Sequence, residues 1–249
     1  MTIPVALQLY TVRDELEKDF LGTLEKVSQA GYRAVEFYSG FFGGLSAEEL
    51  RRELDRLGLK TVGSHVSLQM LREQLEEVTD YLLKLDAEYI ALAWSKFETR
   101  QEWLDLAAFL NDAGRRCAEK GLTLCYHNHN HEFIEYDGQY ALDLILTNSD
   151  PANVKLELDT YWAQYAYVDP VEYTKKLNGR VVLLHQKDMR ASDRKFCEVG
   201  EGIMDIKAIH KAGEQFGAKW FIVEQDACEG PSLVSIKTSL DNLKKMGLD

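Results

Sequence analysis

The sequence predicts an α/β protein, a (β/α)8 or TIM barrel in which an eight-stranded parallel barrel lies inside a ring of helices. Two observations predict this fold: eight short β-rich runs alternate with longer amphipathic segments, and glycines follow the helical patterns. Only four prolines and no low-complexity linker interrupt the 249 residues. One domain spanning 1–249 is therefore expected, since such barrels commonly occupy about 250 residues.

The expected strands are short, apolar and rich in β-branched or aromatic residues. They are 5–10, 34–38, 61–65, 89–94, 122–127, 154–159, 181–185 and 220–224. Between them, helical patterns repeat apolar residues at intervals of three and four, as in 47–57, 71–85 and 101–120.

Glycines punctuate this alternation. Gly31, Gly58, Gly121 and Gly217 each follow a helical pattern and lead into a strand, as expected of left-handed helix C-caps. Strands joined by helices run parallel because right-handed crossovers keep their direction. An open doubly wound sheet is the alternative, but no G-x-G-x-x-G turn follows the first strand.

Composition excludes several classes of function. A formal net charge of −12 with no basic block argues against nucleic acid as a partner. Cys117, Cys125, Cys197 and Cys228 are far apart and form no C-x-x-C pair, which favours a reduced, cytoplasmic setting. The first residues lack a basic segment, and no apolar run approaches the ~20 residues that span a bilayer, so neither export nor a membrane partner is expected.

Polar side chains end nearly every expected strand. Barrel strands are covered on both faces, so a titratable residue there must be paired or functional. The residues at or just beyond the strand ends are Gln8, Tyr10, Glu36, His65, Trp94, His127, Asn128, His129, Asp159, His185, Lys187, Asp188, Glu224, Gln225 and Asp226. Because such barrels carry their chemistry at the carboxyl ends of the strands, we expect one shared polar site at that mouth.

The segment 124–133 is rich in histidine. A solvated loop explains His131 well, but His127 and His129, at the strand end, favour a functional role. Elsewhere Asp159, His185 and Glu224 end three strands, and together they form a mixed oxygen and nitrogen donor set. Such a set suits Mn²⁺, Co²⁺, Mg²⁺ or Zn²⁺, although Asp159 alone is equally explained as a helix N-cap.

These residues resemble the xylose-isomerase-like barrels of the sugar phosphate isomerase/epimerase group, which includes ketose 3-epimerases, inosose dehydratase and lyases acting on 3-keto-glycosides. The resemblance spans essentially the whole chain. Its matching segments are 7–16, 31–36, 126–129 with Glu132 and Phe133, 158–162, 184–188, 199–202 and 223–226. The histidine-rich 126–129 segment is the most specific of them.

The resemblance implies one divalent ion, bound here by Asp159, His185 and Glu224. The family's fourth ligand is a glutamate at the end of the fifth strand, where this chain has His127. Either His127 binds the ion or Glu132 reaches back to it. We expect Glu132, because a third carboxylate suits a hard ion.

The resemblance also implies chemistry on a small carbohydrate or cyclitol. The ion would stabilise an enediolate formed when the C–H next to a carbonyl loses its proton. Glu224, His127 and His129 are the expected proton-transfer groups, and Lys187 is expected to orient or neutralise an oxygen. Expected substrate contacts are Gln8, Tyr10, Glu36, His65, Trp94, Trp162 and Arg190.

Isomerisation or epimerisation is the expected outcome. Dehydration or lyase chemistry on a keto-sugar or inosose proceeds through the same intermediate. The sequence supports it about as well as isomerisation or epimerisation, because His127 replaces the second glutamate that epimerases use. A non-catalytic, metal-containing sugar-binding barrel is the alternative from another class, to be distinguished by the absence of open coordination positions. A multi-zinc nuclease is opposed by the charge of −12 and by the few histidines.

Two further expectations concern partners. The acidic loop 198–202 disfavours a phosphorylated substrate, although Arg190 and Arg194 could offset its charge. Phe41 and Phe42 would cover either the substrate or a neighbouring subunit, which leaves room for a homo-oligomer.

Overall fold

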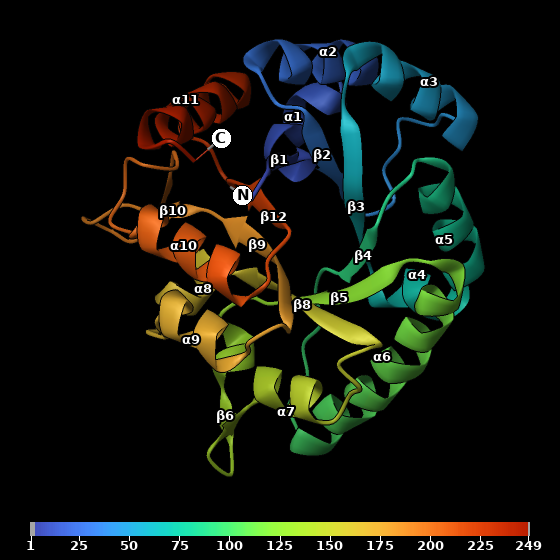
Figure 1. Cartoon of the computed structure of the whole chain (residues 1–249), viewed down its shortest axis with the longest axis vertical. Coiled ribbons are helices and arrows are strands. Elements are labelled where there is room, and N and C mark those ends of the chain that lie inside the picture. Colours follow the sequence, from blue (N-terminus) through green and yellow to red (C-terminus); the bar gives the residue numbers. More distant parts are fainter. Residues whose placement is uncertain (1–2, 249) are drawn as a thin grey trace.

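The computed structural model describes residues 3–248, which form a closed barrel of eight parallel strands ringed by helices (Figure 1). In barrel order the strands are β1 (Val5–Gln8), β12 (Trp220–Val223), β9 (Val181–Gln186), β8 (Val154–Asp159), β5 (Thr123–His127), β4 (Tyr89–Leu92), β3 (Lys60–Val66) and β2 (Ala34–Phe37). The first strand pairs with the last, and the expected TIM barrel is confirmed.

Helices connect the strands on the outside. They are α1 (Arg13–Leu16), α2 (Phe20–Ala30), α3 (Ala47–Leu57), α4 (Leu68–Glu73), α5 (Leu75–Lys84), α6 (Arg100–Lys120), α7 (Ala141–Thr147), α8 (Thr160–Tyr165), α9 (Pro170–Lys176), α10 (Ile206–Phe216) and α11 (Ser232–Met246), with 3₁₀ turns η1 (Leu9–Val12) and η2 (His131–Phe133). No helix within 3–248 is both long and apolar enough to cross a membrane.

Capping residues set the limits of these helices. Ser46 and Glu49 form a reciprocal capping box at the start of α3. Thr99 and Glu102 do the same at the start of α6. At the other ends, the four glycines expected as C-caps all have positive φ, as at Gly58, where φ is 65°.

The structure corrects three of the predicted elements, of which strand 89–94 ends early at Leu92. The first strand stops at Gln8 and not at residue 10, because the Gln8 side chain accepts a hydrogen bond from the Tyr10 backbone N–H and the chain turns into η1. The predicted helix 71–85 is two helices, α4 and α5, that meet at Gln74, where φ is −132°. Leu71 and Leu75 keep helical spacing across this break, so the apolar pattern does not reveal it.

Two short hairpins were not predicted. Strands β6 (Glu135–Tyr136) and β7 (Gln139–Tyr140) pair beyond the fifth barrel strand. Strands β10 (Asp188–Met189) and β11 (Phe196–Cys197) pair beyond the seventh. Both hairpins therefore follow the carboxyl ends of barrel strands, where the expected site lies.

The barrel interior is layered. A layer of mostly small or apolar residues includes Ala6, Ala34, Cys125, Leu183 and Ile222. Side chains on one face of a strand recur every second residue. Two residues further on, the same inward faces therefore carry Gln8, Glu36, His127, His185 and Glu224, which are all buried. The apolar layer thus supports a polar layer at the carboxyl ends of the strands.

Close strand packing at this level predicts a stability effect. A Cβ added at Gly63 in β3 would lie 2.4 Å from the Tyr89 carbonyl oxygen and 3.1 Å from the Tyr89 Cβ atom. Gly63→Ala should therefore lower the free energy of unfolding by about 1–3 kcal/mol, as overpacking usually does. Urea unfolding measures it, with Gly230→Ala as the control because, apart from its chain neighbours, no residue of 3–248 has an atom within 4 Å of the added Cβ. Equal stability of both variants would contradict the packing argument.

Candidate active site

The polar layer opens into a cavity of about 230 Å³ at the carboxyl ends of the strands. It is lined by Tyr10, Tyr38, Ser39, His65, Ala93, Trp94, His127, His129, Lys187, Glu224 and Asp226. The volume suits one small polar molecule, since sites for drug-sized ligands are usually larger. Its wall includes all four expected catalytic residues.

Four side chains, which we call the upper group, present ligand atoms that all lie within 4.8 Å of one another: His127, Asp159, His185 and Glu224. Nδ1 of His185 is 2.9 Å from Oε2 of Glu224, and Nε2 of His127 is 3.8 Å from Oδ2 of Asp159. The structure thus brings three of the four expected metal ligands together with His127.

Asp159 combines the two roles weighed for it. Its Oδ1 accepts a hydrogen bond of 2.9 Å from the Trp162 backbone N–H and so caps α8. Its Oδ2 is buried and lies 2.9 Å from the Lys187 ammonium. A buried carboxylate oxygen is unfavourable without a cation beside it, and Lys187 supplies one here.

A second set of side chains, the deeper group, comprises His65, His127, Glu157 and His185, whose ligand atoms also lie within 4.8 Å of one another. Glu157 precedes Asp159 by two residues on β8, so it lies one step further into the barrel on the same face. Its Oε2 is 2.6 Å from Nε2 of His65 and 3.1 Å from Nδ1 of His127. The two groups therefore share His127 and His185.

Glu36 adjoins the deeper group. Its Oε2 is 2.7 Å from Nε2 of His185 and accepts a 2.8 Å hydrogen bond from Nε2 of Gln8. Burial and the neighbouring Glu157 carboxylate raise the pKa of Glu36 to about 7. Burial would also raise the pKa of Glu157, but the charges of His185 and His65 outweigh it and hold that pKa well below its usual value.

Lys187 neutralises the upper group. Its ammonium Nζ lies 2.9 Å from Asp159 Oδ2, 3.0 Å from Glu224 Oε2 and 2.7 Å from Asp226 Oδ1. Burial would lower the pKa of Lys187, but Asp159 and Asp226 outweigh it and raise that pKa well above its usual value. Burial likewise works against the ionised form of Glu224, whose pKa the Lys187 charge nevertheless holds well below its usual value.

Burial keeps two of the histidines neutral. It lowers the pKa of His127 to about 3 and that of His129 to about 2. His129 also packs 5.6 Å from the Trp162 ring, and its Nδ1 is buried without a hydrogen-bond partner among the described residues. At neutral pH both rings thus carry one N–H and one free lone pair.

Glu132, the ligand expected from the sequence, lies outside both groups. Its Oε1 accepts a 2.7 Å hydrogen bond from the Tyr126 hydroxyl, and its Oε2 accepts a 2.8 Å hydrogen bond from the His129 backbone N–H. These contacts anchor the loop that follows β5. The geometry therefore favours His127 over Glu132 as the ligand contributed by the fifth strand.

The expected substrate contacts fall into three sets. Tyr10, His65 and Trp94 line the cavity, and the Trp94 side chain is 54% exposed at its rim. Gln8, Glu36 and Trp162 are not part of the cavity wall. Gln8 and Glu36 are hydrogen-bonded to each other and lie beside the deeper group. Arg190 lies outside, because its guanidinium hydrogen-bonds to Asp193 and Glu229.

Sequence reasoning missed Glu157, Asp226, Tyr38 and Ser39 as site residues. Glu157 had a readable signal, since Asp159 was expected to face the interior and the residue two positions earlier shares its face. Asp226 was noted at a strand end, but its contact with Lys187 depends on a side-chain direction that the sequence does not show. Ser39 adopts φ of 51°, which no residue pattern indicated.

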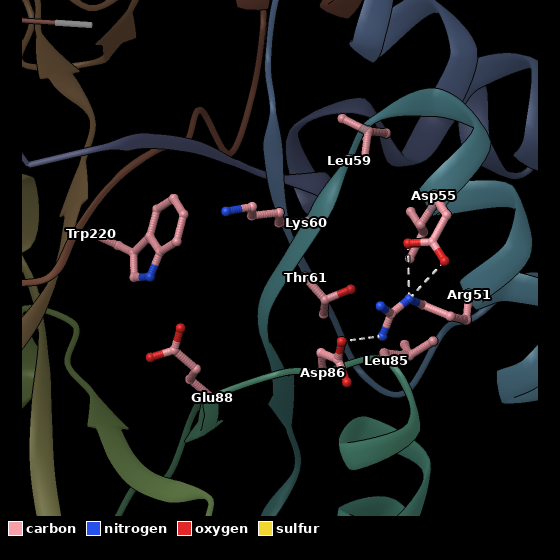
Figure 2. Close-up of a pocket in the computed structure, with 10 residues that line it drawn as sticks. Arg51, Asp55, Leu59, Lys60, Thr61, Leu85, Asp86, Glu88 and Trp220 are labelled. Atoms are coloured by element: carbon pink, nitrogen blue, oxygen red, sulfur yellow. Dashed lines mark hydrogen bonds and ion pairs between the residues drawn. The ribbon is translucent and has the colours of Figure 1, made fainter.

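A hollow of about 360 Å³ opens near the amino-terminal ends of β3, β4 and β12 (Figure 2). There Arg51 pairs with Asp55 and Asp86, as the dashed lines in Figure 2 show. Trp220 and Lys60 stand at the starts of their strands. This is the end of the barrel that usually serves stability and not chemistry.

Together, the closed parallel barrel and the carboxylate- and histidine-lined cavity at its strand ends define a TIM-barrel enzyme. The chain belongs to the xylose isomerase-like TIM barrel family, which matches residues 24–246. The family resemblance inferred from the sequence is thereby confirmed.

Relatives narrow the type of enzyme. An inosose dehydratase from Histophilus somni is 30% identical over 253 residues, covering 84% of this chain and 83% of that protein. An inosose dehydratase from Halalkalibacterium halodurans is 28% identical over 232 residues, covering 82% and 71%. The structure of a sugar phosphate isomerase/epimerase from Parabacteroides distasonis has a TM-score of 0.84 and 26% identity, with 98% of both chains covered. The chain is thus an enzyme of the isomerase or lyase type.

Proposed function

We propose that the protein is a divalent-metal-dependent enzyme that removes the proton next to the carbonyl of a keto-cyclitol or keto-sugar and then eliminates water. The convergence of the upper group with Lys187 at the wall of one small cavity carries this proposal. The likeness to inosose dehydratases supports elimination as the outcome. Isomerisation or epimerisation would begin with the same proton removal, and the assay below includes both.

The upper group fits a divalent ion. Two carboxylates and two imidazoles, all buried and with ligand atoms within 4.8 Å of one another, form a mixed donor set suited to Mn²⁺, Co²⁺, Mg²⁺ or Zn²⁺. His127 would bind through Nε2 and His185 through Nδ1, the nitrogens that face Asp159 and Glu224. When bound, the ion would supply Lewis-acid polarisation of the substrate carbonyl and its neighbouring hydroxyl.

The chain's own groups would move the proton and hold the substrate. Glu224, kept ionised by Lys187, would accept the proton from carbon. The Lys187 ammonium would neutralise the oxygen that gains charge, and the neutral His129 ring would hydrogen-bond a hydroxyl. In elimination, the C–O bond breaks at the carbon adjacent to the one that lost its proton, on the side away from the carbonyl. The hydroxyl group on that carbon takes a proton from an acidic group of the site and leaves as water.

The substrate is proposed to be unphosphorylated. Arg190 is engaged by Asp193 and Glu229, and the Arg194 guanidinium lies 4.7 Å from the Tyr165 ring centroid and donates to backbone carbonyls. Neither arginine lines the cavity, and the loop 198–202 is acidic. Apart from the proposed ion, the described cavity wall therefore offers a phosphate dianion only Lys187 as a counter-charge, and three carboxylates already surround Lys187.

The test is an activity screen of the metal-loaded protein on inososes, keto-sugars and aldoses, followed by NMR in D₂O. Solvent deuterium at the carbon next to the carbonyl, lost on chelation and restored by Mn²⁺, is the expected result. An unsaturated product would establish elimination, and a changed configuration would establish epimerisation. Tight sugar binding without exchange or product would replace this proposal with the sugar-binding barrel.

The fifth strand provides a separate prediction. His127→Asn should weaken Mn²⁺ binding at least ~10-fold because it removes a proposed ligand, whereas Glu132→Gln should leave Mn²⁺ affinity within about threefold. Glu132→Gln should instead lower the melting temperature, since glutamine has a single acceptor oxygen for the two hydrogen bonds that the Glu132 carboxylate accepts from Tyr126 and the His129 backbone. Calorimetric titration and thermal unfolding measure the two effects. The opposite pattern would return the ligand role to Glu132, as the sequence suggested.

A further inference from the structure

The deeper group has the geometry of a cation site. Nε2 of His65, Nδ1 of His127 and Nε2 of His185 face the Glu157 carboxylate at 2.6, 3.1 and 3.3 Å. Neighbouring donors around an ion with bonds of about 2.1 Å stand roughly 3 Å apart. All four residues are buried, and His65 also reaches the cavity wall, which gives an ion a path of entry.

The electrostatic surroundings differ between the two groups. The upper carboxylates already have a cation beside them, the Lys187 ammonium. Among the described ion pairs, Glu157 and the adjoining Glu36 meet only histidines and no lysine or arginine. Oε1 of Glu36 and Oε1 of Glu157 are both buried without a hydrogen-bond partner in the described chain. Within residues 3–248, the only positive charges beside the deeper carboxylates are therefore those of His65 and His185 when protonated, and a bound ion would take the place of those protons.

We propose that the deeper group, His65, His127, Glu157 and His185, is a second divalent-cation site that the chain occupies as an alternative to the upper group. Three imidazoles and one carboxylate favour an ion of borderline softness such as Co²⁺ or Zn²⁺. The upper group, with two carboxylates, favours harder Mn²⁺ or Mg²⁺. The inference rests partly on the proposed function, since both groups use His127 and His185.

Ring chemistry makes the two sites exclusive. His127 turns Nδ1 to Glu157 and Nε2 to Asp159, while His185 turns Nε2 to Glu157 and Nδ1 to Glu224. A neutral imidazole has one nitrogen with a free lone pair and one that carries hydrogen. When an ion is bound to one nitrogen of each ring, the other nitrogen carries hydrogen and donates to a carboxylate of the other group. This hydrogen bond holds the ring in position, as is common for metal-bound histidines. One ion per chain is the expected stoichiometry.

Metal titration of two variants separates the sites. His65→Asn removes a ligand from the deeper group alone, and Asp159→Asn removes one from the upper group alone. Binding of Co²⁺ and Mn²⁺ to the metal-free protein is measured by calorimetry and by visible absorption of Co²⁺. We expect His65→Asn to weaken Co²⁺ at least ~10-fold with Mn²⁺ within about threefold, and Asp159→Asn to do the reverse.

Two further variants serve as controls for nonspecific effects of substitution and for misfolding. His131→Asn makes the same substitution at the mouth but outside both groups, and it should change neither affinity. Glu157→Gln keeps the shape of the side chain and should reproduce the His65→Asn result if that variant does not fold. Anomalous diffraction from wild-type crystals soaked in Co²⁺ should place the ion between Nε2 of His65 and Nε2 of His185.

The outcomes separate this inference from the proposed function. If Asp159→Asn weakens both ions and His65→Asn weakens neither, the upper site stands and the deeper site is overturned. If His65→Asn weakens Co²⁺ while Asp159→Asn leaves Mn²⁺ unchanged, the deeper site stands and the upper assignment falls. Two ions bound together per chain would overturn the mutual exclusion.

Discussion

The Glu224→Gln variant is expected to lose at least ~100-fold of the metal-dependent C–H exchange, the usual contribution of a general base. The amide cannot accept a proton, and it also removes the negative charge that Lys187 and His185 face at 3.0 and 2.9 Å. Exchange is measured by NMR in D₂O on a substrate identified in the screen. With both proteins saturated with metal, because Glu224 is also a proposed ligand, the loss should appear in kcat more than in KM, since the proton moves only in the transition state.

Glu229→Gln is the matched control for this variant. Glu229 follows the same strand, but its side chain is exposed and pairs with Arg190 outside the cavity. The control should exchange within about twofold of the wild type, since exposed ion pairs contribute little. Exchange within tenfold of the wild type in Glu224→Gln would rule out Glu224 as the base. Asp226 would then be the remaining carboxylate of the described cavity wall that could accept the proton.

Replacing Asp188 by alanine should cause the largest loss of stability. The buried Asp188 carboxylate accepts four backbone hydrogen bonds, from the N–H groups of Met189, Gly200, Gly202 and Met204 at 2.7–3.1 Å. Each buried donor left without an acceptor costs about 1–3 kcal/mol. The free energy of unfolding should therefore fall by at least about 3 kcal/mol, as measured by urea denaturation.

Hydrogen exchange locates this effect. The amides of Gly200 and Gly202 should lose protection in Asp188→Ala, because both donate to the same carboxylate oxygen. Asp193→Ala is the control, since Asp193 lies on the same hairpin but is exposed and pairs with Arg190. A loss below about 1 kcal/mol with both amides still protected would show that water replaces the carboxylate.

The barrel was predictable because its strands and helices differ in apolar period and because glycines end the helices. Strand 154–159 was predicted with the bounds that β8 has, and 47–57 with those of α3. The errors fell where side chains act on the backbone, as when Gln8 turns the chain after four residues of β1. Local patterns carry no information on such contacts.

The candidate site was predictable at the level of strand ends. Asp159, His185 and Glu224 meet as expected, because parallel strands bring their carboxyl ends to one mouth. The competition between His127 and Glu132 could not be decided from spacing, since it depends on hydrogen bonds from Tyr126 and from the His129 backbone. Arg190 was misplaced for a similar reason, because Asp193 and Glu229 hold it outside.

Closure of the barrel by β1 and β12 has a consequence for biosynthesis. The ribosome delivers β1 first, yet the pairing of Leu7 with Val223 must wait until nearly the whole chain has emerged. The contacts that join the ends are equally remote in sequence, such as the Gln225 N–H donating to the Thr11 hydroxyl. Until then β1 and β9 each present an unpaired strand edge, which can template pairing with another nascent chain. Shielding by chaperones is thus most valuable to this chain just before its eighth barrel strand is made.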